Sequence, residues 1–190
     1  MSRFTVTDLP LSGLKRIERT RLGDSRGFLS RLFCAEEFAR AGWNKPVAQI
    51  NHTLTGQQGA VRGMHFQHPP HAEMKLVTCV RGEVWDVAVD IRADSATFFK
   101  WHAEILSAEN NRAMLIPEGY AHGFQAMTSD VELLYFHSAG YCASAEGGFN
   151  PCDPGLGISW PLAISEMSER DQAHPALDQM TPKFSGIRLS

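Results

Sequence analysis

Histidine is the residue type best suited to chemistry in this sequence of 190 residues, which contains eight of them. Imidazole has an ordinary pKa close to neutrality, so histidine can serve as a base, an acid or a metal ligand. Four histidines are clustered between residues 52 and 71, and the cluster consists of His52, His65, His68 and His71. A fifth, His122, ends the segment PEGYAH at 117–122. We interpret five of the eight histidines as surface or packing residues. They are His68 and His71 of the cluster, together with His102, His137 and His174.

The segment 117–122 fits the pattern P-x-G-x-x-H, the second sequence motif of cupin barrels. Proline and glycine turn the chain between two strands, and His122 would then point into the mouth of the barrel. Metal-binding cupins add an earlier His-x-His pair, but His65 is followed here by Phe66 and Gln67. Residues two apart on a strand share a face, so Gln67 points with His65 while His68 does not. A zinc or iron site would lack ligands, and the sequence predicts a metal-free barrel.

Alternation of apolar and polar residues predicts a fold made mostly of strands. The segment 75–92 shows it best, with two faces formed by Trp85, Val87, Val89 and Ile91 and by Asp86, Ala88 and Asp90. Within it, Arg81 and Gly82 interrupt two β-rich runs, as a tight hairpin turn would. Shorter strands are predicted over 113–116 and 131–136. Sixteen glycines and ten prolines suit short strands that are joined by turns.

Two short helices complete the predicted elements. One covers residues 35–41 and is stopped by Gly42, and the other covers 168–173 with Ser168 as its N-cap and Asp171 three residues later. The tail at 174–190 is irregular and is expected to pack on the outside of the barrel or on a partner chain. The predicted fold is therefore all-β, a jelly-roll or cupin β-barrel with a few short helices, in a single domain of residues 1–190.

Composition narrows the class of protein further. The formal net charge of -3 argues against a general nucleic-acid binder, which would carry a basic balance. Thirteen of the eighteen basic residues are arginines, which favours an anionic ligand but also fits a compositional bias of the lineage. No apolar run reaches the length of a membrane span, and the N-terminus lacks a signal pattern. The four cysteines are widely separated, so we expect reduced thiols in a cytoplasmic protein.

Several ordered motifs resemble the dTDP-4-dehydrorhamnose 3,5-epimerase family. The strongest are RGMHFQ at 62–67, KLV at 75–77 and DVAVDIR at 86–92, joined by the segments 24–28, 107–110, 116–124, 134–135 and 158–161. The match covers residues 20–178, nearly the whole chain. The resemblance implies a homodimeric isomerase whose N-terminal strand crosses to its partner. It would invert C3 and C5 of a nucleotide-linked 4-keto-6-deoxyhexose without a cofactor, by removal and return of a proton next to the ketone.

Position by position, the resemblance assigns four catalytic groups. His65 matches the base, and Asp171 matches the carboxylate that orients it. Tyr135 matches the acid on the other face of the sugar, and Lys75 matches the cation near the keto oxygen. Each of the last three also admits a plainer role. Asp171 could only cap a helix, Tyr135 could be a core aromatic, and Lys75 could be a solvated strand-end lysine.

The same resemblance assigns the residues that bind the nucleotide sugar. Arg26 and Arg62 match residues that hold the diphosphate, and Tyr141 matches the aromatic that stacks on the base. The other matched positions are Phe28 as an apolar wall, Gln49, Asn51, His122, Glu146 and Arg170.

Some positions depart from the pattern of the family. Arg31 stands where a glutamate is usual, and Tyr141 is followed by Cys142 and Ala143 rather than by a small residue and proline. These changes put in question the nucleotide base, the sugar and the extent of epimerisation, and two alternatives stay open, the second on the histidines alone. The protein could invert a single centre or act on another nucleotide sugar, or it could belong to a different class, a metal-dependent cupin oxygenase that uses His65 and His122.

Overall fold

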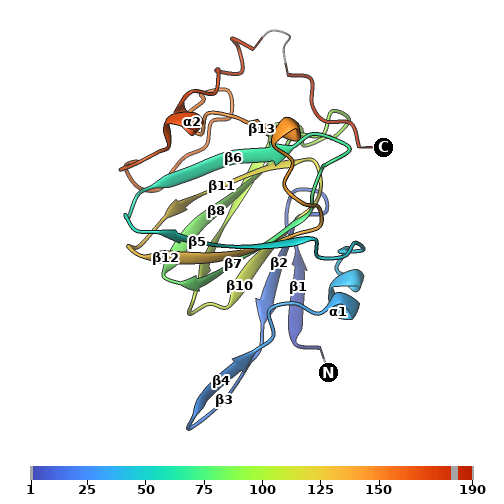
Figure 1. The fold of residues 1–190 in the computed structure, drawn as a ribbon, viewed down its shortest axis with the longest axis vertical. Helices are drawn as coiled ribbons and strands as arrows, with labels where there is room; N and C mark the ends of the chain where they lie inside the picture. Colours follow the sequence, from blue (N-terminus) through green and yellow to red (C-terminus); the bar gives the residue numbers. More distant parts are fainter. Residues whose placement is uncertain (1, 181–183, 190) are drawn as a thin grey trace.

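The computed structural model describes residues 2–180 and 184–189. Two antiparallel sheets face each other, and a two-stranded hairpin extends below them (Figure 1). The larger sheet has the spatial order β1 (Phe4–Asp8), β2 (Lys15–Arg19), β10 (Arg112–Ile116), β7 (Lys75–Arg81), β12 (Val131–His137) and β5 (Gln49–Thr55). The smaller sheet has the order β13 (Glu146–Gly148), β6 (Val61–Gln67), β11 (Tyr120–Ala126), β8 (Glu83–Asp90) and β9 (Trp101–Ser107). The hairpin pairs β3 (Arg21–Asp24) with β4 (Gly27–Ser30). The predicted all-β jelly-roll fold is confirmed, although the sheets do not close into a complete barrel.

Both faces of each sheet are partly covered, because apolar residues occur on both sides of the central strands. The space between the sheets holds one core, which includes Val77, Ala88 and Leu133. A second core lies on the outside of the larger sheet, where Phe38 of α1 (Ala35–Arg40) packs. A third lies on the outside of the smaller sheet, where the C-terminal segment contributes Ile187. The two sheets are therefore packed on both faces, and side chains between them are held by this packing.

The prediction that the strands on either side of Arg81 and Gly82 pair as a hairpin is wrong. The turn is present, but β7 belongs to the larger sheet and β8 to the smaller one, so the chain crosses between sheets at this point. Gly82 has a φ of 72°, and an added Cβ would lie 2.5 Å from the Thr128 hydroxyl oxygen. Both faces of β8 are buried, so the apolar pattern identified the strand but not its neighbour.

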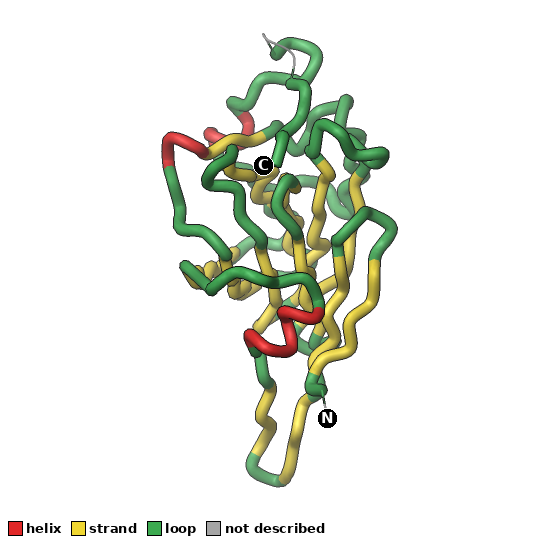
Figure 2. Tube along the Cα trace, turned by 90° about the vertical axis from the view of Figure 1, so that its right-hand side faces the viewer, coloured by secondary structure: helices red, strands yellow, loops and turns green. Residues whose placement is uncertain are grey.

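The two predicted helices are confirmed, as α1 and as α2 (Glu169–Gln172). The Ser168 side chain caps α2 by accepting a hydrogen bond from the Asp171 amide. The tail is irregular, and its described parts pack on the outer face of the smaller sheet through Leu177 and Phe184, while 181–183 and 190 lie outside the described residues. Figure 2 shows the tail at the end of the molecule opposite the β3–β4 hairpin. None of the helices in the described ranges is long and apolar enough to cross a membrane.

Candidate active site

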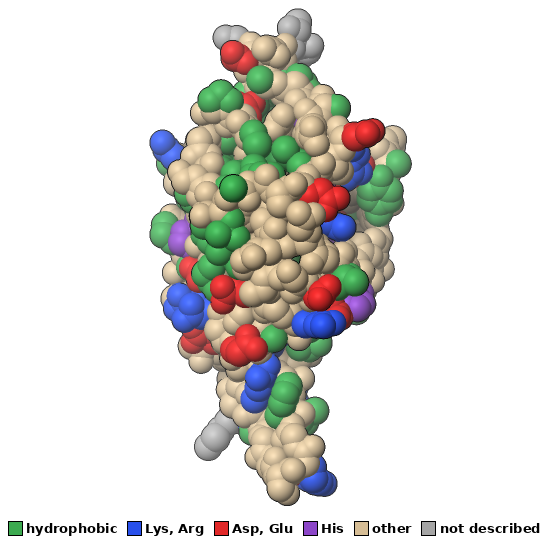
Figure 3. Space-filling view, turned by 90° about the vertical axis from the view of Figure 1, so that its left-hand side faces the viewer, with side chains coloured by type: hydrophobic (Ala, Val, Ile, Leu, Met, Phe, Trp, Pro, Cys, Tyr) green, Lys and Arg blue, Asp and Glu red, His purple; other side chains and the backbone are tan. Residues whose placement is uncertain are grey.

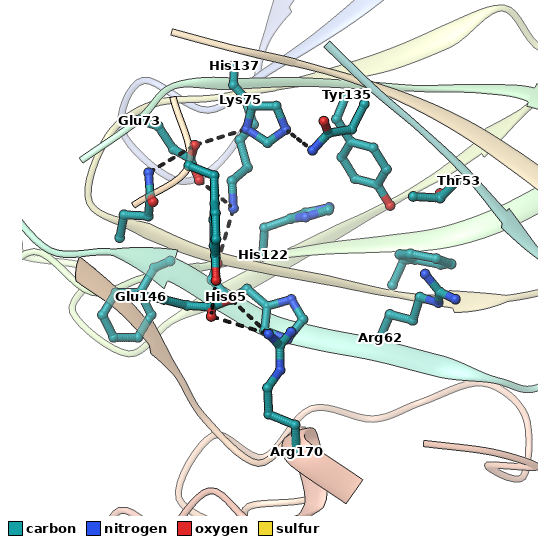
Figure 4. A pocket seen from close by; sticks show the side chains of 15 residues that line it. Thr53, Arg62, His65, Glu73, Lys75, His122, Tyr135, His137, Glu146 and Arg170 are labelled. Atoms are coloured by element: carbon teal, nitrogen blue, oxygen red, sulfur yellow. Dashed lines mark hydrogen bonds and ion pairs between the residues drawn. The ribbon is translucent and has the colours of Figure 1, made fainter. Parts of the chain in front are cut away.

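One cavity of about 280 Å³ opens between the two sheets and collects most of the predicted functional side chains (Figure 4). We call it the central pocket. The predicted residues that line it are Asn51, Arg62, His65, Lys75, His122, Tyr135, Tyr141, Glu146 and Arg170. They come from strands of both sheets, from the loop after β12 and from the segment around α2, so only the folded chain brings them together.

His65 projects from β6 on the wall formed by the smaller sheet, and Asp171 supports it from behind. The His65 Nε2 atom lies 2.7 Å from Asp171 Oδ1, and the other oxygen of this carboxylate accepts a hydrogen bond from the Gly63 amide at 3.2 Å. Burial opposes the charge on Asp171, but the hydrogen bonds from the His65 side chain and the Gly63 amide outweigh it, so the pKa of Asp171 is lowered. An ionised Asp171 therefore faces the histidine at neutral pH.

The contacts of His65 Nε2 decide which ring nitrogen carries the proton. Arg170 Nη2 approaches this atom to 3.1 Å, but arginine is only a donor. One nitrogen cannot donate to Asp171 and accept from Arg170, and the shorter contact to the buried carboxylate places the proton on Nε2. The Nδ1 atom of His65 then keeps its lone pair, as a base requires.

Tyr135 faces the pocket from the opposite wall, since its strand β12 belongs to the larger sheet. Its phenol ring lies 5.9 Å from the ring of His122, and its hydroxyl points toward Thr53 (Figure 4). Burial raises the pKa of Tyr135, and the negative charge of Asp86 adds to the effect. The phenol is therefore protonated at neutral pH and can act as a proton donor.

His122 points into the pocket from β11 and has a buried carboxylate partner. Its Nε2 atom lies 2.7 Å from Oδ1 of Asp86, a fully buried residue on the neighbouring strand β8. Burial raises the pKa of Asp86, against the opposing charge of His122. The turn that begins at Pro117 joins the two sheets and places His122 in the pocket, as the sequence motif predicted.

Lys75 belongs to a cluster of charges at one end of the pocket. Its Nζ atom lies 3.2 Å from Glu73 Oε1 and donates to the His65 carbonyl oxygen at 3.3 Å. His137 Nδ1 lies 3.0 Å from Glu73 Oε2. Burial opposes the charge on Glu73, but the hydrogen bond from His137 and the charge of Lys75 outweigh it, so the pKa of Glu73 is lowered. His137 packs on Tyr135, as its interpretation as a surface or packing residue allows, but its ring also lines the pocket.

The more exposed side chains of the pocket, such as Tyr141 and Arg170, are suited to the rest of a substrate. Tyr141 donates its hydroxyl hydrogen to Glu146 at 3.0 Å, and Arg170 Nη1 donates to the same carboxylate at 3.1 Å. Gln49 lies at the margin, where its side chain donates to Asn51 and accepts from the Tyr141 amide, both at 3.0 Å. Tyr141 is 59% exposed, so its ring is open to a stacking partner.

Two predicted residues do not reach the central pocket of their own chain. Arg26 and Phe28 lie on the β3–β4 hairpin, which projects from the body of the protein (Figure 1). Arg26 pairs with Asp24 at 2.6 Å, and Phe28 is 60% exposed beneath the guanidinium of Arg21. Arg31 also lies away from the pocket, in an ion pair with Glu37 at 2.8 Å.

Six residues that line the pocket were not among the predicted site residues, namely Thr53, Phe66, Gln67, Glu73, Phe124 and His137, and Asp86 behind His122 was also missed. A spacing of two residues from a predicted one could have found most of the six. Thr53, Glu73 and His137 each lie two positions from a predicted residue, namely Asn51, Lys75 and Tyr135. Alternate residues of a strand face the same side. Asp86 carried no such signal, because its contact with His122 depends on the pairing of β8 with β11.

The described side chains of the pocket do not form a metal site. In the described parts of the chain, no group of three or more His, Cys, Asp or Glu side chains is arranged to hold one. The second histidine expected of a His-x-His pair is replaced by Gln67, whose amide donates to the His71 carbonyl oxygen. His68 instead packs edge-on against Phe66, out of the pocket.

The sequence and the fold both resemble those of known proteins. The family model for dTDP-4-dehydrorhamnose 3,5-epimerase matches residues 8–179. This chain belongs to that family. The 3,5-epimerase of Salmonella typhimurium is 42% identical over 165 residues, which cover 86% of this chain and 90% of that protein.

Other members of the epimerase family extend the comparison. The dTDP-4-dehydro-6-deoxyglucose 3-epimerase of Streptomyces bikiniensis is 40% identical over 81% of this chain and 79% of that protein. The crystal structure of the 3,5-epimerase of Legionella pneumophila, in complex with dTDP-4-keto-L-rhamnose, superposes with a TM-score of 0.91. It is 34% identical, and the match covers 98% of this chain and 99% of that one. The family therefore includes relatives that invert two centres and relatives that invert one.

Proposed function

We propose that this protein is a dTDP-4-dehydrorhamnose 3,5-epimerase, which converts dTDP-4-dehydro-6-deoxy-D-glucose to dTDP-4-dehydro-L-rhamnose without a cofactor. One observation carries the proposal beyond family membership. His65, supported by Asp171, and Tyr135 face one pocket from opposite sheets. Inversion of a carbon requires that a proton leave on one face and return on the other, and two groups on opposite walls can do this.

The chemistry follows from these positions. The Nδ1 atom of His65 takes the proton from a carbon next to the C4 ketone, and the electron pair of the C–H bond moves onto the ketone oxygen to form an enolate. The ammonium group of Lys75 stabilises that negative oxygen. Tyr135 then delivers its hydroxyl proton to the opposite face of the carbon, and the ketone forms again. Exchange with solvent returns the two side chains to their starting protonation states.

The diphosphate and base would occupy the more exposed part of the pocket, where Arg62, Tyr141 and Arg170 lie. Arg62 and Arg170 supply positive charge for the phosphates, and Gln49 and Asn51 supply amide hydrogen bonds. The exposed ring of Tyr141 is suited to stack on the base. His122 supplies a polar group against the sugar.

The β3–β4 hairpin supports a homodimer in which each chain contributes to the pocket of its partner. Arg26 and Phe28 are exposed at the tip of the hairpin, next to Leu29, which is 71% exposed. Figure 3 shows hydrophobic and basic side chains on this projection, at the bottom of the view. An isolated two-stranded hairpin is marginally stable in water, so it gains from contact with a second chain. In that arrangement Arg26 would meet the diphosphate and Phe28 would form an apolar wall.

Complementation between inactive variants tests this arrangement. Arg26→Ala and His65→Asn should each be nearly inactive as homodimers, but a mixed dimer contains one pocket with both native residues. Exchange of subunits between the two variants should therefore restore up to about half of the activity per dimer. No recovery in verified mixed dimers would refute the crossed arrangement.

Turnover in deuterated water tests the function itself. We expect NMR to show deuterium at both C3 and C5 of the product, together with inversion of both centres. The second candidate is a 3-epimerase, which the relative in Streptomyces bikiniensis favours. Deuterium and inversion at C3 alone would select that candidate, and no exchange at either carbon would contradict both.

A further inference from the structure

The charged end of the central pocket contains more groups than the proposed proton transfers use. Glu73 and His137 touch neither His65 Nδ1 nor the Tyr135 hydroxyl, yet both line the pocket. The Glu73 side chain is only 9% exposed, as is that of Lys75. Burial of a charged pair has a desolvation cost that the attraction between the charges offsets only in part, and a carboxylate also repels an anionic substrate. The presence of Glu73 and His137 in the pocket therefore indicates a functional role.

Each oxygen of Glu73 has a different partner. Oε1 lies 3.2 Å from Lys75 Nζ, and Oε2 accepts hydrogen bonds from His137 Nδ1 at 3.0 Å and from Gln67 Nε2 at 3.3 Å. His137 is held on its other side, because its Nε2 atom lies 3.4 Å from the Asn51 amide nitrogen. The carboxylate is thus fixed from three strands, β12, β6 and β7. Figure 4 shows the three side chains Glu73, Lys75 and His137 together at this end of the pocket.

We propose that Glu73 is a positioning residue that acts through Lys75, and that His137 holds Glu73 in place for this task. The inference rests on the proposed function, in which the Lys75 ammonium stabilises the enolate oxygen. Lysine has a flexible stem with four rotatable carbons, so its charge is poorly located unless something fixes it. Glu73 Oε1 and the His65 carbonyl oxygen together fix Lys75 Nζ beside the wall that carries the base.

A double-mutant cycle separates this role from a merely structural one. Glu73→Gln replaces one carboxylate oxygen by an NH2 group. That NH2 group then faces either Lys75 or His137, which are themselves donors, so one of the two contacts is lost. In the wild-type background we expect kcat to fall by about 10²-fold, as a misplacement of about 1 Å can cause. Affinity for dTDP should change less than about twofold, because Glu73 contacts none of the groups assigned to the nucleotide. In a Lys75→Met background, the same substitution should change kcat little or raise it.

A matched control exists in the neighbouring sheet. Glu104 accepts from His102 at 2.9 Å and lies 3.6 Å from Arg16, and its side chain is 11% exposed. It is therefore a carboxylate with a histidine and a cation, like Glu73, but outside the pocket. Glu104→Gln should leave kcat unchanged while it affects Tm to a similar extent. An equal loss of kcat in both Lys75 backgrounds, or no loss in Glu73→Gln, would overturn the proposal.

A second variant and a spectroscopic measurement keep the test independent of folding and of the substrate. His137→Phe retains the ring that stacks on Tyr135 but removes the hydrogen bond to Glu73, so kcat should fall only when Lys75 is present. ¹H–¹⁵N NMR of the lysine ammonium groups should show a slowly exchanging signal that is absent in Lys75→Met. Its persistence in Glu73→Gln would contradict the positioning role, whether or not the wild type turns over the dTDP sugar. An inactive wild type with the signal lost in Glu73→Gln would instead contradict the proposed function alone.

Discussion

Asp171 Oδ1 lies 2.7 Å from His65 Nε2, and the two residues come from elements separated by more than half of the chain. The carboxylate also accepts a hydrogen bond from the Gly63 amide, and this second contact fixes the carboxylate that orients the histidine. Because its oxygen can only accept at neutral pH, it selects the tautomer that leaves Nδ1 free. The proposed base thus depends on a short helix near the C-terminus.

Asp171→Asn tests that dependence. The amide nitrogen can donate to Nε2 and favour the opposite tautomer, so we expect kcat to fall by about 10²-fold or more. The loss should exceed any loss of affinity for dTDP, which calorimetry can measure. Ser168→Ala is the control, since it removes the cap of α2 but leaves the carboxylate. If Ser168→Ala lowers kcat as much as Asp171→Asn does, position of the helix rather than the tautomer is responsible.

Tyr135→Phe should separate proton removal from proton return. The base can still abstract a proton and return a deuteron from solvent on the same face, but the acid on the opposite wall is lost. We expect epimerisation to fall by about 10²- to 10⁴-fold while exchange of the substrate C–H with deuterated water persists. Tyr120→Phe is the matched control, because that phenol is buried but bonds to Arg92 and Ser12. Loss of exchange and epimerisation together in Tyr135→Phe would argue against its role as the acid.

Gly63→Ala should disturb the pocket through the backbone. A Cβ there would lie 2.6 Å from the Gly123 Cα atom, and the φ of 124° is unfavourable for alanine. The change should cost about 2 kcal/mol or more in the free energy of unfolding, and displacement of the nearby His65 should lower kcat. Gly56→Ala has open space around the added Cβ and serves as the control. Urea denaturation and turnover of both variants check the prediction. If Gly63→Ala is as stable as Gly56→Ala, strands β6 and β11 can separate to admit the methyl group, and the prediction is wrong.

Asp90 should govern part of the stability at low pH, far from the central pocket. Its carboxylate accepts hydrogen bonds from the Arg92 amide, Nε and Nη2, from Ser95 Oγ and from Thr97 Oγ1. Burial opposes its charge, but these bonds outweigh it and lower the pKa of Asp90 below the ordinary 3.8. A carboxyl group whose pKa is lower in the folded state stabilises the fold at pH values above its unfolded-state pKa. That stabilisation is lost as the pH falls through the folded-state pKa.

The variant Asp90→Asn should therefore be less stable than the wild type by about 3 kcal/mol at neutral pH. The difference should shrink as the pH falls below about 4, because the wild-type carboxylate then becomes protonated too. Urea denaturation of both proteins, from neutral pH to below about 4, measures this difference in the free energy of unfolding. Glu36→Gln is the control, since Glu36 and Arg40 form an exposed pair, and it should change stability by less than about 0.5 kcal/mol at any pH. A constant difference between Asp90→Asn and wild type would refute the linkage.

Much of this protein follows from local pattern. Alternation around Val87 identifies a strand, Gly42 ends a helix, and the turn before His122 is visible in residues 117–122. The motif RGMHFQ also identifies His65 and its family. These properties depend on residues that are neighbours along the chain, so the sequence by itself determined them.

The tertiary structure decided which distant residues meet. Whether β7 pairs with β8, and whether Glu73 reaches Lys75 and His137, depend on the stacking of two sheets whose strands are buried on both faces. Burial on both faces makes an apolar pattern compatible with several neighbours, and only the complete packing selects one. For that reason the identity of the proposed base could be inferred from sequence, while the charge cluster that supports its lysine could not.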